Sequence, residues 1–237
     1  MKKLGRPAPP RQEKPQWWSK LPGMLTVHHL STSQSERVVW LCEELGIDYQ
    51  LVRHQRDPVT RLAPPALRDL TPMGTAPVIE DGDVVMGESG AIVEYIIHKH
   101  GAGRFALPPS HPDYAQYVFW FHFANASLQA VMGRNSALRR AAVPPDNAFA
   151  AGTRARLDLA LKTVDARLAG NAWLAGREFT AADVMSVFCF TTMRIFLPMD
   201  LSPYPGILAY LQRVGARPAY QRAMKKGDPD LAPMLAP

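Results

Sequence analysis

The sequence predicts an α/β domain followed by an all-α domain. Short strand-like runs alternate with helical patterns from Met24 to Gly101, whereas only helical patterns follow the Pro-rich stretch 107–112. A segment that mixes both periodicities is expected to pack helices on a sheet, and a helical segment to pack helix on helix. We therefore predict a basic Pro-rich tail at 1–23, an α/β domain at 24–101, a linker at 102–112, an all-helical domain at 113–226 and a C-terminal tail at 227–237.

The first half predicts the order β-α-β-(α)-β-β-α. Its elements are a strand at 24–30, a helix that Gly46 ends, a strand at 48–54, a Pro-interrupted helix or irregular loop at 61–70, a hairpin of 76–81 and 83–87, and a helix at 89–100. The hairpin is indicated by the Asp81-Gly82 pair between two apolar runs, because this pair favours a tight turn.

The second half predicts helices at 114–132, 153–170, 181–196, 205–215 and 218–225. The first of these is apolar on two faces, so both faces need a partner. The helix at 181 has a clear start, because Thr180 and Asp183 are placed to form a capping box, with Phe179 and Val184 at the hydrophobic-staple positions. Asp183 is therefore expected to have a structural role.

The positive charge is concentrated in the first 23 residues. The chain has a net charge of +6, and residues 1–23 alone carry six basic residues against Glu13, which is +5. A domain that binds a nucleic-acid duplex clusters its charge on a folded face, so we expect no nucleic-acid binding by the folded body. The tail is expected to be disordered. The alternative interpretation is that the tail is an arm in which Trp17 and Trp18 contact a membrane surface or nucleic acid. The partner of such an arm is unknown.

Secretory and membrane signals are lacking in this sequence, because no apolar run forms a signal core or approaches the ~20 residues of a membrane span. Cys42 and Cys189 are the two cysteines, and their spacing fits neither a zinc site nor a disulfide framework. We therefore predict buried thiols, no metal and a cytoplasmic location.

The stretch HHLSTSQSERVVWLCEELG, residues 28–46, places several hydroxyls where a strand meets a helix. Ser33 and Glu36 match the spacing of a capping box, which gives Ser33 a structural role. A serine that accepts as a cap keeps one O–H to donate. That hydrogen can point to an anion near the positive end of the helix.

Two further stretches predict a binding site. Glu88 and Ser89 open a helix after a strand, and free N–H groups together with a hydroxyl at a helix start bind carboxylate or phosphate. Pro77 stands at the entry of a strand, where a proline is tolerated. From the residues alone, the Ala76–Pro77 bond is more often trans than cis.

Together these stretches resemble the cytosolic glutathione transferases, and most of all the bacterial members that use serine instead of a tyrosine. The resemblance covers residues 24–225 and rests on HHLSTSQSERVVWLCEELGIDYQL, TPMGTAPVIEDG, ESGAIVEYI, WLAGREFTAADVMSV and RPAYQRA, in that order. It implies a thioredoxin-like first domain, an all-helical second domain and a homodimer. Glutathione would be the co-substrate.

The resemblance also implies roles for individual residues. Ser33 would activate the glutathione thiol, with Ser35 as second choice. The Ala76–Pro77 bond would be cis, so that the Ala76 backbone binds the cysteinyl group, and Glu88 and Ser89 would hold the γ-glutamyl group. Thr75 replaces a lysine that often holds the glutathione backbone. The residues that could hold the glycine carboxylate instead are Arg53, His54, Arg56 and Arg68.

The expected activity is transfer of glutathione to small apolar electrophiles. Candidate liners of the electrophile pocket are Leu30, Thr32, Trp120, Phe123 and Arg134. Two alternatives remain: a non-catalytic protein that binds ligands or docks to a partner, and a glutathione-dependent disulfide or peroxide reductase. Lowering a thiol pKa from ~8.5 to ~6.5 needs ~2.7 kcal/mol. One hydrogen bond to the thiolate contributes ~1.5–3 kcal/mol and the helix terminus ~0.3–1 kcal/mol.

Overall fold

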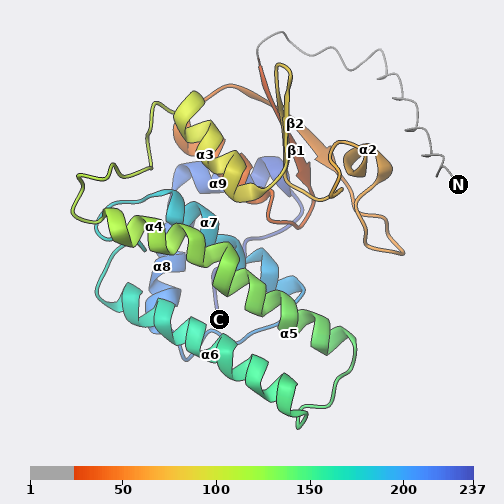
Figure 1. Ribbon diagram of the computed structural model, residues 1–237, viewed down its shortest axis with the longest axis vertical. Helices are drawn as coiled ribbons and strands as arrows, with labels where there is room; N and C mark the ends of the chain where they lie inside the picture. Colours follow the sequence, from red (N-terminus) through yellow and green to blue (C-terminus); the bar gives the residue numbers. More distant parts are fainter. Residues whose placement is uncertain (1–23) are drawn as a thin grey trace, which may run out of the picture.

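A computed structural model describes residues 24–237. The expectations for the tail at 1–23 lie outside the described residues. The first half contains strands β1 (Leu25–Leu30), β2 (Tyr49–His54), β3 (Val78–Asp81) and β4 (Val84–Met86), with helices α1 (Glu36–Leu45), α2 (Pro65–Arg68) and α3 (Ser89–Lys99) (Figure 1). This is the predicted order, and the weak helix at 61–70 is reduced to the single turn α2.

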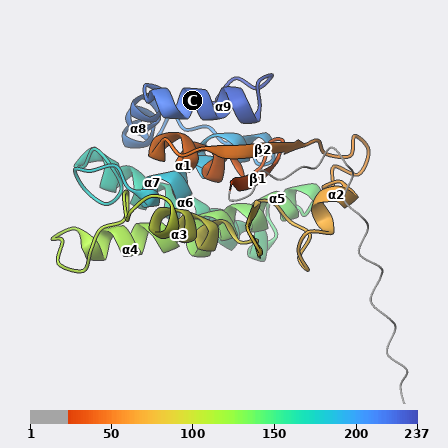
Figure 2. The ribbon, with the colours of Figure 1, turned by 90° about the horizontal axis from the view of Figure 1, so that it is seen from above.

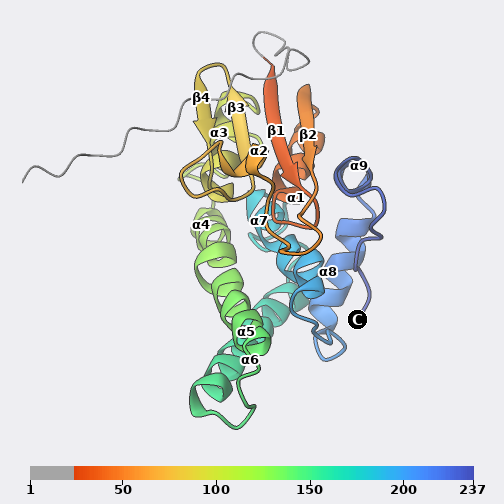
Figure 3. The ribbon, with the colours of Figure 1, turned by 90° about the vertical axis from the view of Figure 1, so that its right-hand side faces the viewer.

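The four strands form one mixed sheet in the order β2-β1-β3-β4 (Figure 3). β1 runs parallel to β2 and antiparallel to β3, and β3 and β4 form the predicted hairpin. The faces of β1 differ: Leu25 and Val27 join the main core, whereas Leu30 joins a small cluster that includes Leu67 of α2. Successive side chains of a strand alternate between faces, so β1 separates two apolar layers.

The second half is entirely helical in the described chain. It contains α4 (Tyr114–Phe123), a π-helical segment (Ala124–Gln129), α5 (Ala130–Arg140), α6 (Ala148–Ala169), α7 (Ala181–Phe190), a 3₁₀ turn (Thr192–Ile195), α8 (Pro205–Gly215) and α9 (Pro218–Gly227). The prediction of one helix over 181–196 is wrong, because Thr191 leaves the helical conformation with ψ −103°. The helix predicted from 153 begins at 148, where the Asn147 side chain accepts the first free N–H groups.

Two predicted helix boundaries are confirmed by their local geometry. Gly46 ends α1 in a left-handed conformation with φ +63°, which glycine adopts without strain. Thr180 and Asp183 form the capping box at the start of α7. Asp183 is fully buried, and its carboxylate also accepts the Leu174 N–H at 3.0 Å and the Tyr210 hydroxyl at 3.2 Å. This aspartate therefore joins three segments of the helical half.

Helix α1 connects the two halves. It packs against α3 of the first half and against α7 and α9 of the second, and Figure 2 shows it between α9 and α3. Val38, Trp40 and Leu41 of α1 are buried in the main core, which continues into α7 and α8 without interruption. The start of α1, with the loop that precedes it, therefore lies at the junction of the sheet and the helices.

Neither cysteine is paired: Cys42 and Cys189 are both buried free thiols. Burial raises the pKa of Cys189 to about 11, so this thiol stays protonated at neutral pH. Within residues 24–237, no helix has the length and apolar character needed to cross a membrane. No three histidine, cysteine or acidic side chains in that range are placed to hold a metal ion.

Candidate active site

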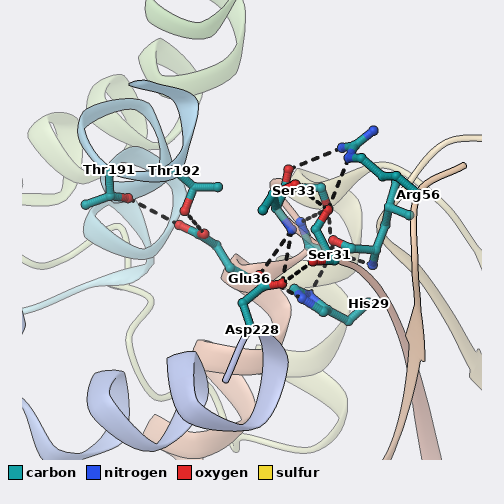
Figure 4. Close-up of polar contacts among 11 residues, drawn as sticks. His29, Ser31, Ser33, Glu36, Arg56, Thr191, Thr192 and Asp228 are labelled. Carbon is teal, nitrogen blue, oxygen red and sulfur yellow. Dashed lines mark hydrogen bonds and ion pairs between the residues drawn. The ribbon is translucent and has the colours of Figure 1, made fainter. Parts of the chain in front are cut away.

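The loop at residues 31–35 joins β1 to α1, and contacts from distant parts of the chain hold it in place (Figure 4). Asp228, just after α9, accepts the Ser31 hydroxyl at 2.6 Å and the Thr32 N–H at 3.1 Å. Arg56 donates to the Ser31 carbonyl at 3.1 Å and to the Thr32 carbonyl at 3.2 Å. Thr32 has φ +53°, a conformation that is unusual for a residue with a side chain. These contacts compensate for that strain.

Ser33 and Ser35 differ in what they have left to offer a ligand. Ser35 is fully buried, and its Oγ accepts the Leu30 N–H at 3.0 Å and lies 2.9 Å from His29 Nδ1 and 2.6 Å from Ser33 Oγ. The Leu30 carbonyl lies at 3.3 Å as a further acceptor for its hydrogen, so the one donor and two acceptor positions of Ser35 are used within the protein. Ser33 is 6% exposed, and its Oγ accepts the Ser35 N–H at 3.2 Å. Ser33 therefore keeps one hydrogen-bonding position for a substrate.

The predicted capping box of Ser33 and Glu36 is wrong. The Glu36 N–H donates to the backbone carbonyl of Ser33 at 3.1 Å, and Ser35, the residue just before α1, makes no side-chain cap. The Glu36 carboxylate instead accepts the hydroxyls of Thr191 and Thr192 from the helical half. These two distant donors outcompete the local partner that the sequence pattern suggests.

The Ala76–Pro77 bond is cis, as the resemblance implied. The Ala76 carbonyl, which precedes it, accepts the Gln34 side-chain amide at 3.1 Å. Gln34 follows Ser33 in the loop, so this hydrogen bond ties the segment before β3 to the segment before α1. The structure thus places two of the predicted site segments side by side.

Ser89 is the first residue of α3 and is almost fully buried. Its Oγ accepts from Arg37 Nη1 and from Asn125 Nδ2, each at 3.1 Å. Both acceptor positions are filled, so the Ser89 hydroxyl hydrogen is left to donate, together with the free N–H groups of the first helical turn. Glu88 precedes it, exposed and with φ +67°. The arrangement offers donors to a carboxylate and one carboxylate to an ammonium group.

A buried arginine links the two site segments. Arg37 is fully buried, and its Nη1 donates to Gln34 at 3.0 Å, to Ser89 at 3.1 Å and to Asn125 at 2.8 Å. Its Nη2 donates to Gln129 at 2.8 Å. Asn125 and Gln129 both lie in the π-helical segment, a type of helix that is frequent at functional sites. Arg37 therefore fixes the distance between the serine loop and the start of α3.

The candidates for the glycine carboxylate are not equally placed. His54 is buried, its Nε2 lies 3.0 Å from His28 Nδ1, and the two rings stack with centroids 5.3 Å apart. Burial, followed by the charge of His28, lowers the pKa of His54 to about 4, so its ring is neutral at pH 7. Arg56 is engaged by the loop carbonyls. Arg53 and Arg68 are exposed, which leaves them as the better candidates.

The five candidates for the electrophile pocket are spread over several elements. Leu30 is buried on the α2 side of the sheet, and the Thr32 hydroxyl donates to the carbonyl of the residue before it. Trp120 is buried and Phe123 half-buried in α4, with ring centroids 5.2 Å apart. Arg134 is exposed on α5. Thr32 thus lies in the serine loop itself, Leu30 directly precedes that loop, and the other three positions lie on α4 and α5.

The comparisons with known proteins cover both halves of the chain. Residues 27–104 match the family described as "Glutathione S-transferase, N-terminal domain", and residues 135–218 match "Glutathione S-transferase, C-terminal domain". A Schizosaccharomyces pombe protein named Glutathione S-transferase 3 is 33% identical over 219 residues, which is 86% of this chain and 88% of that protein. The chain belongs to the glutathione S-transferase family.

Two further relatives extend this result. A crystal structure of a glutathione S-transferase from Actinobacillus pleuropneumoniae has a TM-score of 0.79 and 30% identity, and the match covers 88% of this chain and 97% of that one. The Disulfide-bond oxidoreductase YfcG of Escherichia coli is 26% identical over 86% of this chain and 95% of that protein. The predicted family and the glutathione S-transferase fold, a thioredoxin-like domain followed by a helical domain, are confirmed.

The sequence analysis missed Asp228 as a residue of this candidate site, and it gave Glu36 only a capping role. The sequence predicts a C-terminal tail that includes Asp228, but this residue is buried and contacts the serine loop. Asp228 contacts the His29 ring, from which it is separated by 199 residues in the sequence. The one local signal was the His28-His29 pair inside an apolar strand, because a buried histidine needs polar partners.

Glu36 is a buried carboxyl group beside the site. Burial raises the pKa of Glu36 to about 7, although the Thr192 hydroxyl and the Arg37 charge act in the opposite direction. Between about pH 4.5 and pH 7 the folded protein therefore binds more protons here than the unfolded chain does. The stability that Glu36 contributes is fully present at acid pH and is lost as the pH rises towards 7.

We expect Glu36→Gln to remove this pH dependence. The free energy of unfolding of the variant, relative to the native protein, should increase by roughly 2–3 kcal/mol between pH 5 and pH 8. Urea unfolding at the two pH values measures this difference. Glu178→Gln is the matched control, because Glu178 is 71% exposed and should show no such change. A difference for Glu36→Gln that is the same at both pH values would contradict the expectation.

Proposed function

We propose that this protein is a glutathione transferase in which Ser33 hydrogen-bonds the glutathione thiol and stabilises it as a thiolate. The observation that carries the proposal is the unfilled hydrogen-bonding position of Ser33, in a loop fixed by Asp228 and Arg56. A thiolate is the nucleophilic form of a thiol. It attacks the electrophilic carbon of a small apolar substrate, and the leaving group departs with the electron pair of the broken bond.

The arrangement around Ser33 supports an extended placement of glutathione. The Ala76 backbone next to the cis bond binds the cysteinyl group, and the donors at the start of α3, with Ser89, bind the γ-glutamyl carboxylate. The Glu88 carboxylate accepts a hydrogen bond from the γ-glutamyl ammonium group. Thr75 is exposed and carries no positive charge, so the glycine carboxylate is assigned to Arg53 or Arg68.

We expect Glu88→Ala to weaken glutathione binding about tenfold, because one hydrogen bond between charged groups contributes ~1.5–3 kcal/mol. The pKa of the bound thiol should not change, since Glu88 acts at the other end of the tripeptide. Calorimetry measures the affinity and ultraviolet absorbance measures the thiolate. Glu94→Ala, on the next turn of α3, is the matched control and should leave the affinity unchanged. Equal affinities of Glu88→Ala and the native protein would show that the γ-glutamyl group binds elsewhere.

A reductase function within the same fold is the second candidate, and the 26% identity to the E. coli disulfide-bond oxidoreductase favours testing it. Residues 33–36 contain no cysteine, so the reducing thiol would be that of glutathione. Initial rates should be compared for an activated aryl halide and for a small disulfide. Faster conjugation supports the transferase, faster reduction supports the reductase, and glutathione binding without turnover supports a non-catalytic binding protein.

A homodimer in the cytoplasm is also proposed. A surface hollow of about 440 Å³ lies along α3 and α4, and its lining includes Phe121 and Met185. Phe119, on the same helix as Phe121, is 50% exposed. Exposed apolar surface of this kind supports contact with a second copy. Light scattering of the full chain tests the mass, and a monomer at micromolar concentration would contradict the dimer.

A further inference from the structure

Two serines, a histidine and an aspartate form a continuous buried chain behind the proposed thiol site (Figure 4). Ser33 Oγ lies 2.6 Å from Ser35 Oγ, which lies 2.9 Å from His29 Nδ1. The other ring nitrogen, His29 Nε2, lies 3.1 Å from Asp228 Oδ2. A Cβ added to Gly227 would lie 3.1 Å from His29 Nε2, so the end of α9 packs directly on the ring.

The positions of the hydrogens follow from Asp228. Burial by itself would raise the pKa of Asp228, but the hydrogen bonds that it accepts, led by the one from His29, hold the pKa below its usual value. An ionised carboxylate can only accept, so His29 Nε2 carries a hydrogen. In the neutral ring Nδ1 is then an acceptor and takes the Ser35 O–H. The Ser35 oxygen accepts the Ser33 O–H, which therefore points inward.

A bound thiolate requires the opposite arrangement. Ser33 stabilises a thiolate only when its hydrogen points outward, so at the 2.6 Å contact Ser35 must be the donor. Ser35 can then no longer donate to His29, and two lone pairs facing each other at 2.9 Å would repel. His29 Nδ1 must therefore donate as well. Because Nε2 already holds a hydrogen, the thiolate arrangement requires a protonated ring.

We propose that Asp228, His29 and Ser35 form a proton relay that acts through Ser33 and stores the glutathione thiol proton on His29 while the thiolate is bound. This inference rests on the proposed function, because it describes how the same serine handles the proton of the same thiol. Ser33 is the catalytic residue, since it touches the thiol. Ser35, His29 and Asp228 are positioning residues.

The proton transfer is balanced along the chain. The S–H bond breaks and a new O–H bond forms on Ser33, which passes its own hydrogen to Ser35. Ser35 passes its hydrogen to Nδ1 of His29. The electron pair of the S–H bond stays on sulfur, and the ring becomes an imidazolium that donates to the carboxylate of Asp228. The total charge of thiol and relay is unchanged, so no proton needs to leave the site.

The surroundings of the ring are consistent with this storage. Asp228 after α9 and His54 of β2 interact with the ring, and Arg53 of β2 pairs with His29 in the sheet. Glu36 of α1 and Arg56 after β2 interact in turn with Asp228. His54 is neutral at pH 7, because burial and then the charges of its neighbouring histidines lower its pKa to about 4. Within the described chain, Asp228 is the carboxylate that contacts the ring directly, and it compensates for the charge of the imidazolium.

The decisive measurement counts protons against thiolate. Glutathione is titrated into the full-length protein at pH 7 in buffers of different ionisation enthalpy, which gives the protons released, while absorbance near 240 nm gives the thiolate formed. S-methylglutathione, which has no ionisable thiol, supplies the baseline. We expect far fewer than one proton released per thiolate. A ratio of one overturns the relay but leaves the proposed function intact, whereas binding without thiolate overturns both.

Two variants test the chain without removing Ser33. His29→Gln cannot store a proton, so each thiolate that still forms should release one proton, and the thiolate fraction at pH 7 should fall at least fivefold. Asp228→Asn keeps an acceptor for the loop and removes the negative charge. It should therefore also raise the number of protons released per thiolate towards one. Glutathione affinity measured with S-methylglutathione should stay within about twofold, which separates this effect from a structural one.

The chain offers a matched control in a second histidine–aspartate pair. His100 Nε2 lies 2.7 Å from Asp81 Oδ2 at the end of α3, with the histidine partly exposed and no contact with the serine loop. His100→Gln and Asp81→Asn should leave the proton ratio and the thiolate fraction at native values. If His29→Gln fails to fold, the number of protons released per thiolate in the native protein and in Asp228→Asn still tests the relay. An unchanged ratio in a folded His29→Gln overturns the relay.

Discussion

Ser33→Ala is expected to lower kcat/KM for conjugation about 10- to 100-fold and to leave the glutathione affinity within about twofold. The reason is the loss of one hydrogen bond to a charged sulfur, which contributes ~1.5–3 kcal/mol. The thiol pKa of bound glutathione should rise by about one to two units for the same reason. Steady-state kinetics and a pH titration of the thiolate absorbance measure the two effects on the same preparation.

Two further variants make this result interpretable. Ser33→Thr keeps the hydroxyl and should recover a thiolate at neutral pH. Ser202→Ala removes an exposed hydroxyl between the 3₁₀ turn and α8 and should behave as the native protein does. An unchanged low thiol pKa in Ser33→Ala would move the role to Ser35 or to the backbone N–H groups of the loop, and the catalytic assignment would be wrong.

Asp183→Ala is expected to have the largest effect on stability, a loss of roughly 3–5 kcal/mol in the free energy of unfolding. Asp183 is fully buried, and its removal leaves the N–H groups of Leu174 and Thr180 and the Tyr210 hydroxyl without an acceptor. Each such buried donor costs ~1–3 kcal/mol, and the helix start loses its cap. Chemical unfolding at pH 7, followed by circular dichroism, measures the change.

The control for this prediction is a carboxylate that also accepts a tyrosine hydroxyl but is exposed. Asp158 accepts the Tyr204 hydroxyl at 2.9 Å and is about half exposed, so Asp158→Ala should cost no more than about 1 kcal/mol. Asp183→Asn keeps one acceptor, so its loss in the free energy of unfolding should lie between those of Asp183→Ala and Asp158→Ala. Equal losses for Asp183→Ala and Asp158→Ala would mean that the buried network does not stabilise the fold.

Local signals explain most of what the sequence could predict about the fold. Gly46 ends a helix by its own conformational freedom, and Thr180 with Asp183 starts one with side chains three residues apart, so each boundary depends on neighbours in the chain. Ser33 and Glu36 have the same spacing as Thr180 and Asp183, but they do not form a capping box. Thr191 and Thr192, more than 150 residues away, supply the donors that Glu36 uses. A spacing rule has no information about such competitors.

The candidate site follows the same division. Ser33, Ala76–Pro77 and Ser89 stand at the ends of predicted strands or helices, so sequence reasoning could find them. Asp228 could not be found, because its role depends on where α9 ends relative to β1. The two-sided nature of β1 was also beyond reach: Leu30 and His29 are adjacent, but they face opposite sides of the sheet. Leu30 is consequently buried under α2.

The contact between Asp228 and the serine loop has a consequence for biosynthesis. The loop belongs to the first part of the described chain that leaves the ribosome, whereas the carboxylate that holds Ser31 and Thr32 is synthesised 196 residues after the latter. At translation rates of about 5–20 residues per second, the delay is on the order of 10–40 seconds. A nascent chain can therefore form its sheet well before its serine loop is complete, and the loop can take its final form only after Asp228 has been synthesised.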